Sequence, residues 1–279
     1  MAYKTILLHL SASANAVQRI RIAARLAIAS QATLIGAAMI GVSTQTFRDA
    51  RIGEKDPALA GHLRFLSNRA GELVNQFHDE VRTAGVLLYE GRVVDGEAVA
   101  GICLQARYSD LVIVGLTDSN EKSPSVPPDF PEAVLLHAGR PVLFIPPSCN
   151  KEQVGARVLV AWNASKEARR AVTDAIPLLR GAEVVDVAVF NPETEPDMRD
   201  EMPNRDFAVY LSRHGVNVNL LQPQQTRDIG RAVLDTARER GADLLVLGGY
   251  GHTRFRELLM GGVTRTVLHE SDVPILMSH

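Results

Sequence analysis

The stretch GGYGHTRFRELLMGGVT, residues 248–264, follows a short apolar run at residues 244–247 and leads into a segment with a helical pattern. Glycine accepts positive φ and lets a ligand approach the main chain closely. The start of a helix offers unpaired N–H groups and a positive dipole end, which favour an anion. We therefore expect the two glycine clusters to close on one phosphate chain from two sides. Positive charge nearby comes from Arg254, Arg256 and Arg265.

The spacing of the glycines separates this stretch from the common phosphate loops. No Gly-Lys-Ser/Thr follows the glycines, as a Walker A loop requires, and Arg254 stands where G-x-G-x-x-G needs its last glycine. The pattern is instead G-x2-G-x9-G, with Gly248, Gly251 and Gly261 as its fixed points. The alternative interpretation is that these glycines only form turns. The strand before them and the helix after them favour phosphate binding.

The chain contains an internal repeat. Residues 6–13, ILLHLSAS, match residues 158–165, VLVAWNAS, at an offset of 152 residues. Residues 109–115, SDLVIVG, match residues 242–248, ADLLVLG, at an offset of 133, so the first copy carries 19 extra residues. We expect the extra residues in the polar segment 41–63 and a linker at residues 146–156. The repeat predicts two related domains, residues 1–147 and 154–279.

Each copy alternates short apolar runs with segments of helical period. In the second copy, apolar runs cover residues 158–162, 184–190, 216–222, 244–248 and 274–278. Helical patterns between them cover residues 165–180, 205–214, 229–240 and 263–270. The first copy has its apolar runs at residues 6–10, 33–40, 86–93, 111–115 and 142–146. This alternation predicts an α/β fold with a mostly parallel sheet covered on both faces.

The G-x2-G-x9-G loop after a strand, set in this alternating pattern, resembles the universal stress protein family over nearly the whole chain. The resemblance implies two tandem doubly wound domains, each a five-stranded parallel sheet with helices on both faces. In such sheets ligands bind beyond the carboxyl ends of the strands, where the winding direction reverses. The resemblance also implies that the second domain binds ATP, with or without Mg²⁺. The predicted site consists of Asn163, Val189, Leu247, Gly248, Gly251, His252, Arg254, Gly261, Gly262, Val263 and Thr264.

Some site positions depart from the family's pattern or allow a second interpretation. The family has Ser or Thr directly after the third glycine; here Gly262 supplies only its backbone N–H. The family has an acidic residue at the end of the first strand; here Asn163 lacks the charge that suits a ribose diol. Val189 matches an apolar position that lines the adenine pocket, or it is a plain core residue. His252 reads equally well as a phosphate or ribose contact and as an exposed loop residue.

The first copy lacks the loop. After Gly115 the next glycine is Gly139, and the prolines at positions 124, 127, 128 and 131 remove backbone donors. Acidic residues at positions 118, 121 and 129 would repel phosphates. We expect the first domain to bind no triphosphate in this manner. It would serve as a scaffold or partner surface, or hold a different ligand.

Composition and motifs argue against several other functions. A net charge of −2 gives no general reason to expect nucleic acid or an anionic membrane as a partner. The eight histidines and two cysteines show no metal-ligand spacing. No nucleophile motif occurs, so we name no catalytic residue. No stretch approaches membrane-spanning length and no signal-peptide layout is present, which makes a cytoplasmic location the expectation.

The favoured hypothesis is a tandem universal stress protein that binds ATP in its second domain and acts as a nucleotide-dependent sensor or regulator. The resemblance also implies pairing of the two domains through their last strands, PVLFIP and PILMSH, and further association into a homodimer. Two alternatives stay open. One is a slow ATP hydrolase or phosphotransferase that uses the same loop, and the other is a nucleotide-free interaction scaffold.

Overall fold

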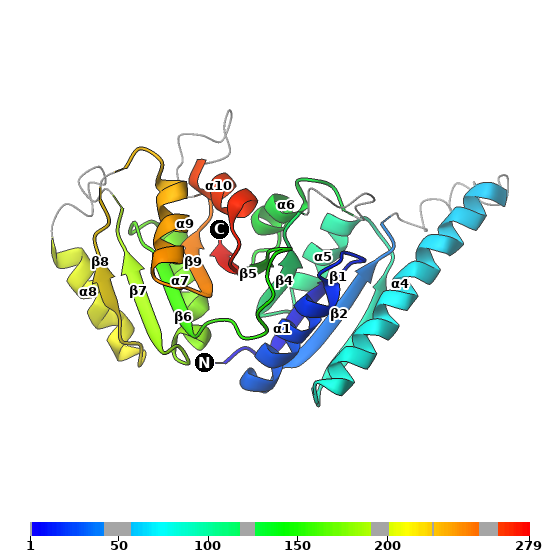
Figure 1. The fold of residues 1–279 in the computed structure, drawn as a ribbon. Coiled ribbons are helices and arrows are strands. Elements are labelled where there is room, and N and C mark those ends of the chain that lie inside the picture. Colours follow the sequence, from blue (N-terminus) through cyan, green and yellow to red (C-terminus); the bar gives the residue numbers. More distant parts are fainter. Residues whose placement is uncertain (1, 42–56, 118–125, 191–200, 225, 251–261) are drawn as a thin grey trace. The chain divides into compact units, whose positions relative to one another are not determined.

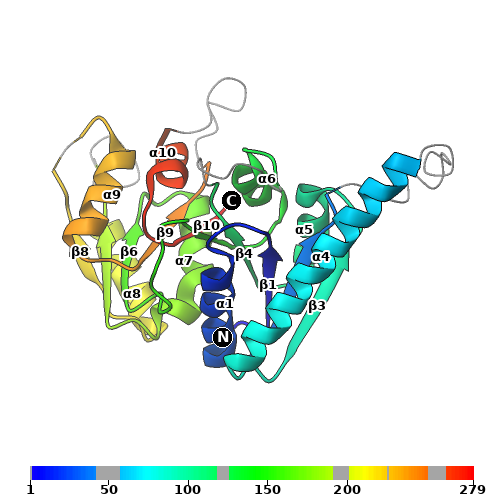
Figure 2. The same ribbon diagram turned by 45° about the vertical axis from the view of Figure 1, so that its right-hand side comes forward.

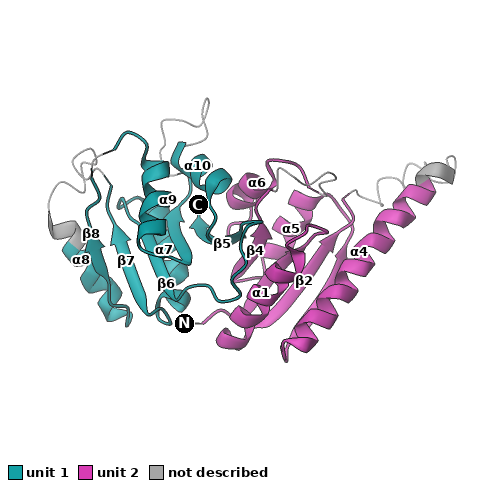
Figure 3. Cartoon of the chain, viewed as in Figure 1, with its two compact units in different colours: residues 1, 141–279 teal, residues 2–140 magenta. Residues whose placement is uncertain are grey.

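The structure is a computed structural model that describes residues 2–41, 57–117, 126–190, 201–224, 226–250 and 262–279. The chain divides into two compact units, residues 2–140 and residues 141–279 (Figure 3). The division falls a few residues before the predicted linker, because strand β5 at residues 142–145 pairs within the second unit. In the described part of the chain, no helix has both the length and the hydropathy needed to cross a bilayer.

The unit of residues 2–140 is a four-stranded parallel sheet in the order β3-β2-β1-β4. Its strands are β1 (Thr5–Leu10), β2 (Thr33–Met39), β3 (Tyr89–Val94) and β4 (Leu111–Gly115). Its helices are α1 (Ala16–Ser30), α4 (Pro57–Thr83), α5 (Ala98–Ala106) and α6 (Phe130–His137). Helix α1 contacts α4, and α5 contacts α6, so the two pairs cover the two faces of the sheet (Figures 1 and 2).

The unit of residues 141–279 has strands in the order β5-β10-β9-β6-β7-β8. These are β5 (Val142–Ile145), β6 (Arg157–Ala161), β7 (Val184–Ala188), β8 (Asn219–Leu221), β9 (Leu244–Gly248) and β10 (Ile275–Ser278). Its helices are α7 (Lys166–Leu179), α8 (Glu201–Arg213), α9 (Ile229–Glu239) and α10 (Gly262–Glu270). Helices α9 and α10 pack together, and Thr173 of α7 lies 3.4 Å from Tyr210 of α8, oxygen to oxygen.

The strand order confirms the doubly wound α/β fold. The order β3-β2-β1-β4 recurs as β8-β7-β6-β9, so equivalent strands keep equivalent neighbours. In the first copy β2 and β3 follow β1 on one side and β4 lies on its other side; in the second copy β7 and β8 follow β6 on one side and β9 lies on its other side. The winding direction therefore reverses between β1 and β4, and again between β6 and β9, where a ligand is expected.

The repeat extends into the helices that follow the first strand of each copy. Six buried positions of α1 lie at the same offset of 152 residues from six buried positions of α7. In α1 these are Ala16, Arg19, Ile20, Ala23, Ala24 and Ala27, and in α7 they are Ala168, Ala171, Val172, Ala175, Ile176 and Leu179. The two helices therefore present matching faces to their own sheets. One pair differs in size and charge: Arg19 corresponds to Ala171.

Two details differ from the sequence-based expectation. Helix α4 spans 27 residues and α8 spans 13, so much of the extra length of the first copy lies in a longer helix, which overlaps the predicted segment 41–63 only at residues 57–63. Strands β3 and β8 each begin three residues later than predicted, at Tyr89 rather than Val86 and at Asn219 rather than Val216. Gly85, with φ of +79°, follows the end of α4, and the backbone N–H of Val86 donates to the carbonyl of Val81. Leu87 is then 93% exposed, because the apolar run serves the helix end and not the strand.

Strands β5 and β10 pair in antiparallel orientation, with Phe144 opposite Ile275 and Val142 opposite Met277. All four side chains are buried. These are the last strands of the two sequence copies, and both lie in the compact unit of residues 141–279. The pairing of two whole domains, and the homodimer, stay predictions.

Candidate functional site

The candidate site lies at the edge of the sheet where β6 and β9 end. The two strands pair in parallel, with Ala161 beside Leu247 at their carboxyl ends. Asn163 follows β6 after one intervening residue, and Gly248 is the last residue of β9. The fold thus brings the strand-end residues of the predicted site to one edge of one sheet, at the reversal of winding.

Asn163 shapes the turn that leads into helix α7. Its Oδ1 accepts a hydrogen bond from the backbone N–H of Ser165 at 3.2 Å, and Ala164 between them has φ of +58°. The hydroxyl of Ser165 then accepts from the backbone N–H of Ala168 at 3.1 Å and caps the helix. The oxygen of Asn163 is therefore already used by the protein, a role that its sequence position did not disclose.

Gly248 marks the closest approach between β9 and the first turn of α7. A methyl group added to Gly248 would lie 2.6 Å from the carbonyl carbon and 2.8 Å from the Cβ of Glu167. No side chain fits at this distance, so the position requires glycine. The sequence predicts that a ligand approaches the main chain closely at these glycines. At Gly248 the close neighbour in the structure is Glu167, in the first turn of α7.

The two ends of the glycine loop meet. The backbone N–H of Tyr250 donates to the hydroxyl oxygen of Thr264 at 3.2 Å, and Tyr250 has φ of +55°. The N–H of Gly249 donates to the carbonyl of Ser278 at 2.9 Å. These bonds tie the end of β9 to the first turn of α10 and to β10. The hydroxyl of Thr264, a residue of the predicted site, therefore has a structural role in closing the loop.

Four residues of the predicted site, Gly251, His252, Arg254 and Gly261, lie outside the described residues. Beyond them, helix α10 begins at Gly262, which is exposed and would meet nothing within 4 Å if it carried a methyl group. Val263 is half-buried and Thr264 is buried. The first-turn N–H groups of α10 have no partners within the helix, and they are the donors that could hold an anion at this end of the loop.

The apolar residues of the predicted site belong to the core. Val189 and Leu247 are both buried, and the N–H of Val189 donates to the carbonyl of Leu221 at 3.1 Å. Trp162, which precedes Asn163, is also buried, and its ring stacks on Phe207 of α8 with 3.8 Å between ring centres. Within the described part of the chain the indole Nε1 has no hydrogen-bond partner. Lining of an adenine pocket by Val189 stays a prediction.

One residue at this edge escaped the sequence reasoning. Glu167, in the first turn of α7, is only 4% exposed. Its Oε1 lies 3.4 Å from the Nζ of Lys166, while its Oε2 is buried and has no hydrogen-bond partner in the described residues. A signal was available: Glu167 lies four residues before Ala171, in the buried stripe of α7.

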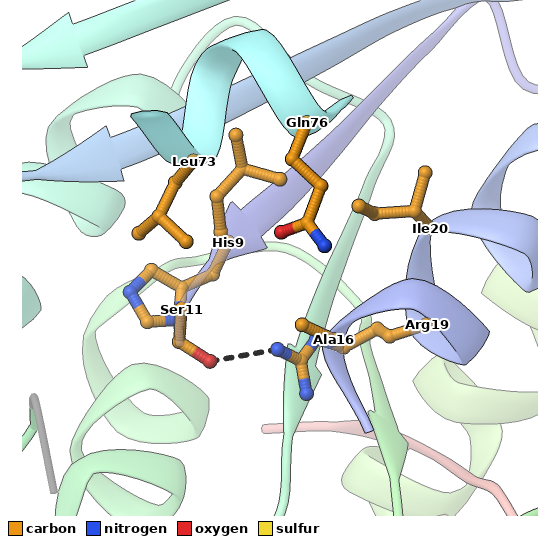
Figure 4. A pocket seen from close by; sticks show the side chains of 8 residues that line it. His9, Ser11, Ala16, Arg19, Ile20, Leu73 and Gln76 are labelled. Atoms are coloured by element: carbon orange, nitrogen blue, oxygen red, sulfur yellow. Dashed lines mark hydrogen bonds between the residues drawn. The ribbon is translucent and has the colours of Figure 1, made fainter. Parts of the chain in front are cut away.

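The first unit fills the corresponding place with its own side chain. Arg19 is 3% exposed, and its Nη2 donates to the hydroxyl of Ser11 at 2.7 Å (Figure 4). The same nitrogen donates to the hydroxyl of Ser13 at 3.2 Å. The guanidinium of Arg19 lies against Gly115, where an added methyl group would be 3.2 Å from Cζ. Ser11 and Gly115 correspond to Asn163 and Gly248 of the second unit. A guanidinium therefore lies between the ends of β1 and β4.

His9, beside this arginine, is a core residue. It is buried, and its ring lies 4.7 Å from that of Phe130. Burial, and secondly the charge of Arg19, lower the pKa of His9 to about 3. The imidazole is therefore neutral at physiological pH, in keeping with a packing role.

The described residues contain no group of three or more His, Cys, Asp or Glu side chains arranged to hold a metal ion. Cys103 and Cys149 are both free thiols. Burial raises the pKa of each thiol above its usual value. A raised pKa makes both poor nucleophiles at neutral pH.

Comparison with known proteins finds similarity to several universal stress proteins. A universal stress protein from Archaeoglobus fulgidus has the same fold over 98% of this chain and 97% of its own, with 17% identity and a TM-score of 0.72. A universal stress protein from Methanocaldococcus jannaschii is 33% identical over 45 residues, which are 16% of this chain and 28% of that protein. A universal stress protein in complex with cAMP covers 52% of this chain and 98% of its own, at 21% identity and a TM-score of 0.37.

The family itself is identified by the sequence of the second unit. The sequence model of the universal stress protein family matches residues 156–279. These residues include β6, β9, α10 and the complete G-x2-G-x9-G loop. This is the same stretch in which the strand ends, the close approach at Gly248 and the tied loop ends occur. Residues 156–279 are therefore a domain of the universal stress protein family.

Proposed function

We propose that the universal stress protein domain of residues 156–279 binds ATP, with or without Mg²⁺, on the loop between β9 and α10. We propose further that the chain acts in the stress response as a nucleotide-dependent regulator. The observation that carries the proposal is the hydrogen bond from Tyr250 N–H to Thr264 Oγ1. It brings the end of a strand and the start of a helix together on either side of a glycine loop. That arrangement suits a phosphate chain.

The chemistry around the loop supports an anionic ligand. The first turn of α10 offers unpaired N–H groups, and Gly262 leaves the space beside them open. Arg265 lies exposed on the same helix, and the sequence places Arg254 and Arg256 inside the loop. Main-chain donors with flanking arginines would grip phosphate oxygens without any metal ligand from the protein.

A regulatory role is favoured over an enzymatic one because the sequence offers no nucleophile motif and no obvious base beside the loop. Binding without turnover leaves the ligand as a signal whose occupancy follows its concentration. A cytoplasmic location and the association of two chains belong to the same proposal, and neither is needed for the binding test.

The test starts with the full-length chain as purified from cells, examined by native mass spectrometry for bound ATP, ADP or AMP. Titration calorimetry with ATP, AMP and cAMP, with and without Mg²⁺, then gives the affinity of the stripped protein. Gly251→Val should abolish ATP binding. Gly71→Val, on α4 of the other unit where nothing lies within 4 Å, should leave it unchanged.

Three outcomes separate the hypotheses. ATP binding lost only in Gly251→Val supports the proposal. Steady phosphate release that disappears in the same variant would replace the regulator by a hydrolase. Failure of the unaltered chain to bind any of the nucleotides at millimolar concentration would favour the interaction scaffold.

A further inference from the structure

The carboxylate of Glu167 lies where the strand end, the glycine loop and a helix start converge. Its main chain and Cβ touch Gly248, the first fixed glycine of the loop. Glu167 lies in the first turn of α7, a helix of 14 residues that Ser165 caps. A negative side chain is stabilised at this end of a helix by the helix dipole. The carboxylate is thus held at the edge of the sheet by two packed elements.

One oxygen of this carboxylate has nothing to bond. Oε2 of Glu167 is buried and has no hydrogen-bond partner among the described residues, while Oε1 lies 3.4 Å from the exposed ammonium of Lys166. Buried polar atoms in native proteins nearly always have a partner, because a buried atom without one loses its hydrogen bonds to water. An acceptor left open at the edge where a ligand is expected indicates that the ligand brings the donor.

The chemistry of a nucleotide limits which group can be that donor. Phosphate oxygens are acceptors and carry negative charge, so a carboxylate repels them. The donors of ATP are the ribose hydroxyls and the amino group of adenine. The ribose is the part next to the phosphates, and Glu167 touches the glycine at which the phosphate loop begins. The ribose hydroxyls are therefore the donors nearest to this position.

The neighbouring strand end offers a weaker acceptor, because hydrogen bonds to a charged group are the stronger ones. Asn163 carries no charge, and its Oδ1 is occupied by the N–H of Ser165 at 3.2 Å. We propose, on the basis of the proposed function, that Glu167 accepts a hydrogen bond from a ribose hydroxyl and makes this site selective for ribonucleotides. Glu167 is then a specificity-determining residue four positions beyond the strand end.

The experiment measures ATP, 2′-deoxy-ATP and 3′-deoxy-ATP on the full-length chain by titration calorimetry. The unaltered protein should bind ATP about ten- to a hundredfold more tightly than at least one deoxy analogue, the range for a hydrogen bond to a charged group. Glu167→Gln should weaken ATP binding by a similar factor while leaving that analogue's affinity nearly unchanged. Lys166→Gln, which alters only the exposed neighbour of Oε1, should keep the discrimination.

Each other outcome overturns the inference. Equal affinity of the unaltered protein for all three nucleotides means that no ribose hydroxyl is read. An equal loss for all three in Glu167→Gln assigns the residue to the turn or to Mg²⁺ rather than to the ribose. If Glu167→Gln does not fold, Glu167→Asp keeps the charge but retracts it by one methylene, and retained discrimination there is equally fatal. Absence of all nucleotide binding refutes the proposed function as well, which distinguishes the two failures.

Discussion

Replacing Gly248 by alanine tests whether the site depends on the contact between β9 and the first turn of α7. The new methyl group would lie 2.6 Å from the carbonyl carbon of Glu167 and 2.8 Å from its Cβ. Carbon atoms in contact prefer about 3.5–4.0 Å, so strand and helix must separate by about 1 Å. The obstacle is main chain, which cannot rotate away. Overpacking of this kind costs about 1–3 kcal/mol.

The cost should appear as a fall in Tm of roughly 3–10 °C, because a domain of this size loses roughly 2–4 °C per kcal/mol. Trp162, the single tryptophan of the chain, is buried in the same unit and reports the unfolding by its fluorescence. ATP affinity should fall as well, since the loop begins at the displaced glycine.

Gly262→Ala is the matched control for this substitution. It adds the same methyl group to the other glycine cluster, where nothing lies within 4 Å and the residue begins a helix. Its Tm should stay within about 2 °C of the unaltered protein or rise slightly, because alanine favours a helix. The reasoning is refuted if Gly248→Ala melts like the unaltered protein, or if both variants lose the same stability.

Three further predictions concern single side chains. Gly262→Ser restores the hydroxyl that the family has after the third glycine, and calorimetry should show ATP bound about three- to tenfold more tightly, as one added hydrogen bond allows. His9 stays neutral in the fold down to pH about 3, while the unfolded chain protonates it below about 6.5. The free energy of unfolding should therefore fall by up to about 1.4 kcal/mol per pH unit between pH 6.5 and 3, and urea titrations followed by circular dichroism should show a weaker fall in His9→Gln. Asp186 accepts hydrogen bonds from Arg240 at 2.8 Å and Asn219 at 3.0 Å. Burial raises the pKa of Asp186, but these bonds lower it by more, so the pKa lies below its usual value. Its contribution is present above about pH 4 and lost as the pH falls below that, so Asp186→Asn should cost about 1–3 kcal/mol at pH 7 and progressively less in acid.

The fold could be predicted well because the signals were local and occurred twice. Buried strands such as residues 244–248 are continuous apolar runs ended by glycine, and β9 has those bounds. Strands β3 and β8 were predicted three residues too early, because the first residue of each apolar run, Val86 or Val216, completes the end of the preceding helix. The bond from Val86 N–H to the carbonyl of Val81 spans five residues and is local, so Gly85 was the signal in the sequence that the helix end, and not the strand, continues to Val86.

The site was predicted in part, for a related reason. Glycine spacing and the strand before it identify the loop, and the described loop ends at Tyr250 and Thr264 do meet. Glu167 was overlooked because a glutamate at the start of a helix is ordinarily a solvated residue that suits the dipole. Its burial depends on Gly248, which is 81 positions later in the chain. Such non-local contacts decide which polar groups lose their water.

The arginine between β1 and β4 has a consequence for how a duplicated protein can respond to its surroundings. The guanidinium of Arg19 is part of the chain, so its concentration at this place does not depend on the solution. The space between the ends of β1 and β4 is therefore always filled by the same group. At the corresponding position of the other half, Ala171 contributes only a methyl group. On the proposed function, the occupancy of the second unit would vary with the concentration of a diffusible ligand, while that of the first unit would not change. Ala171→Arg would make the two units alike.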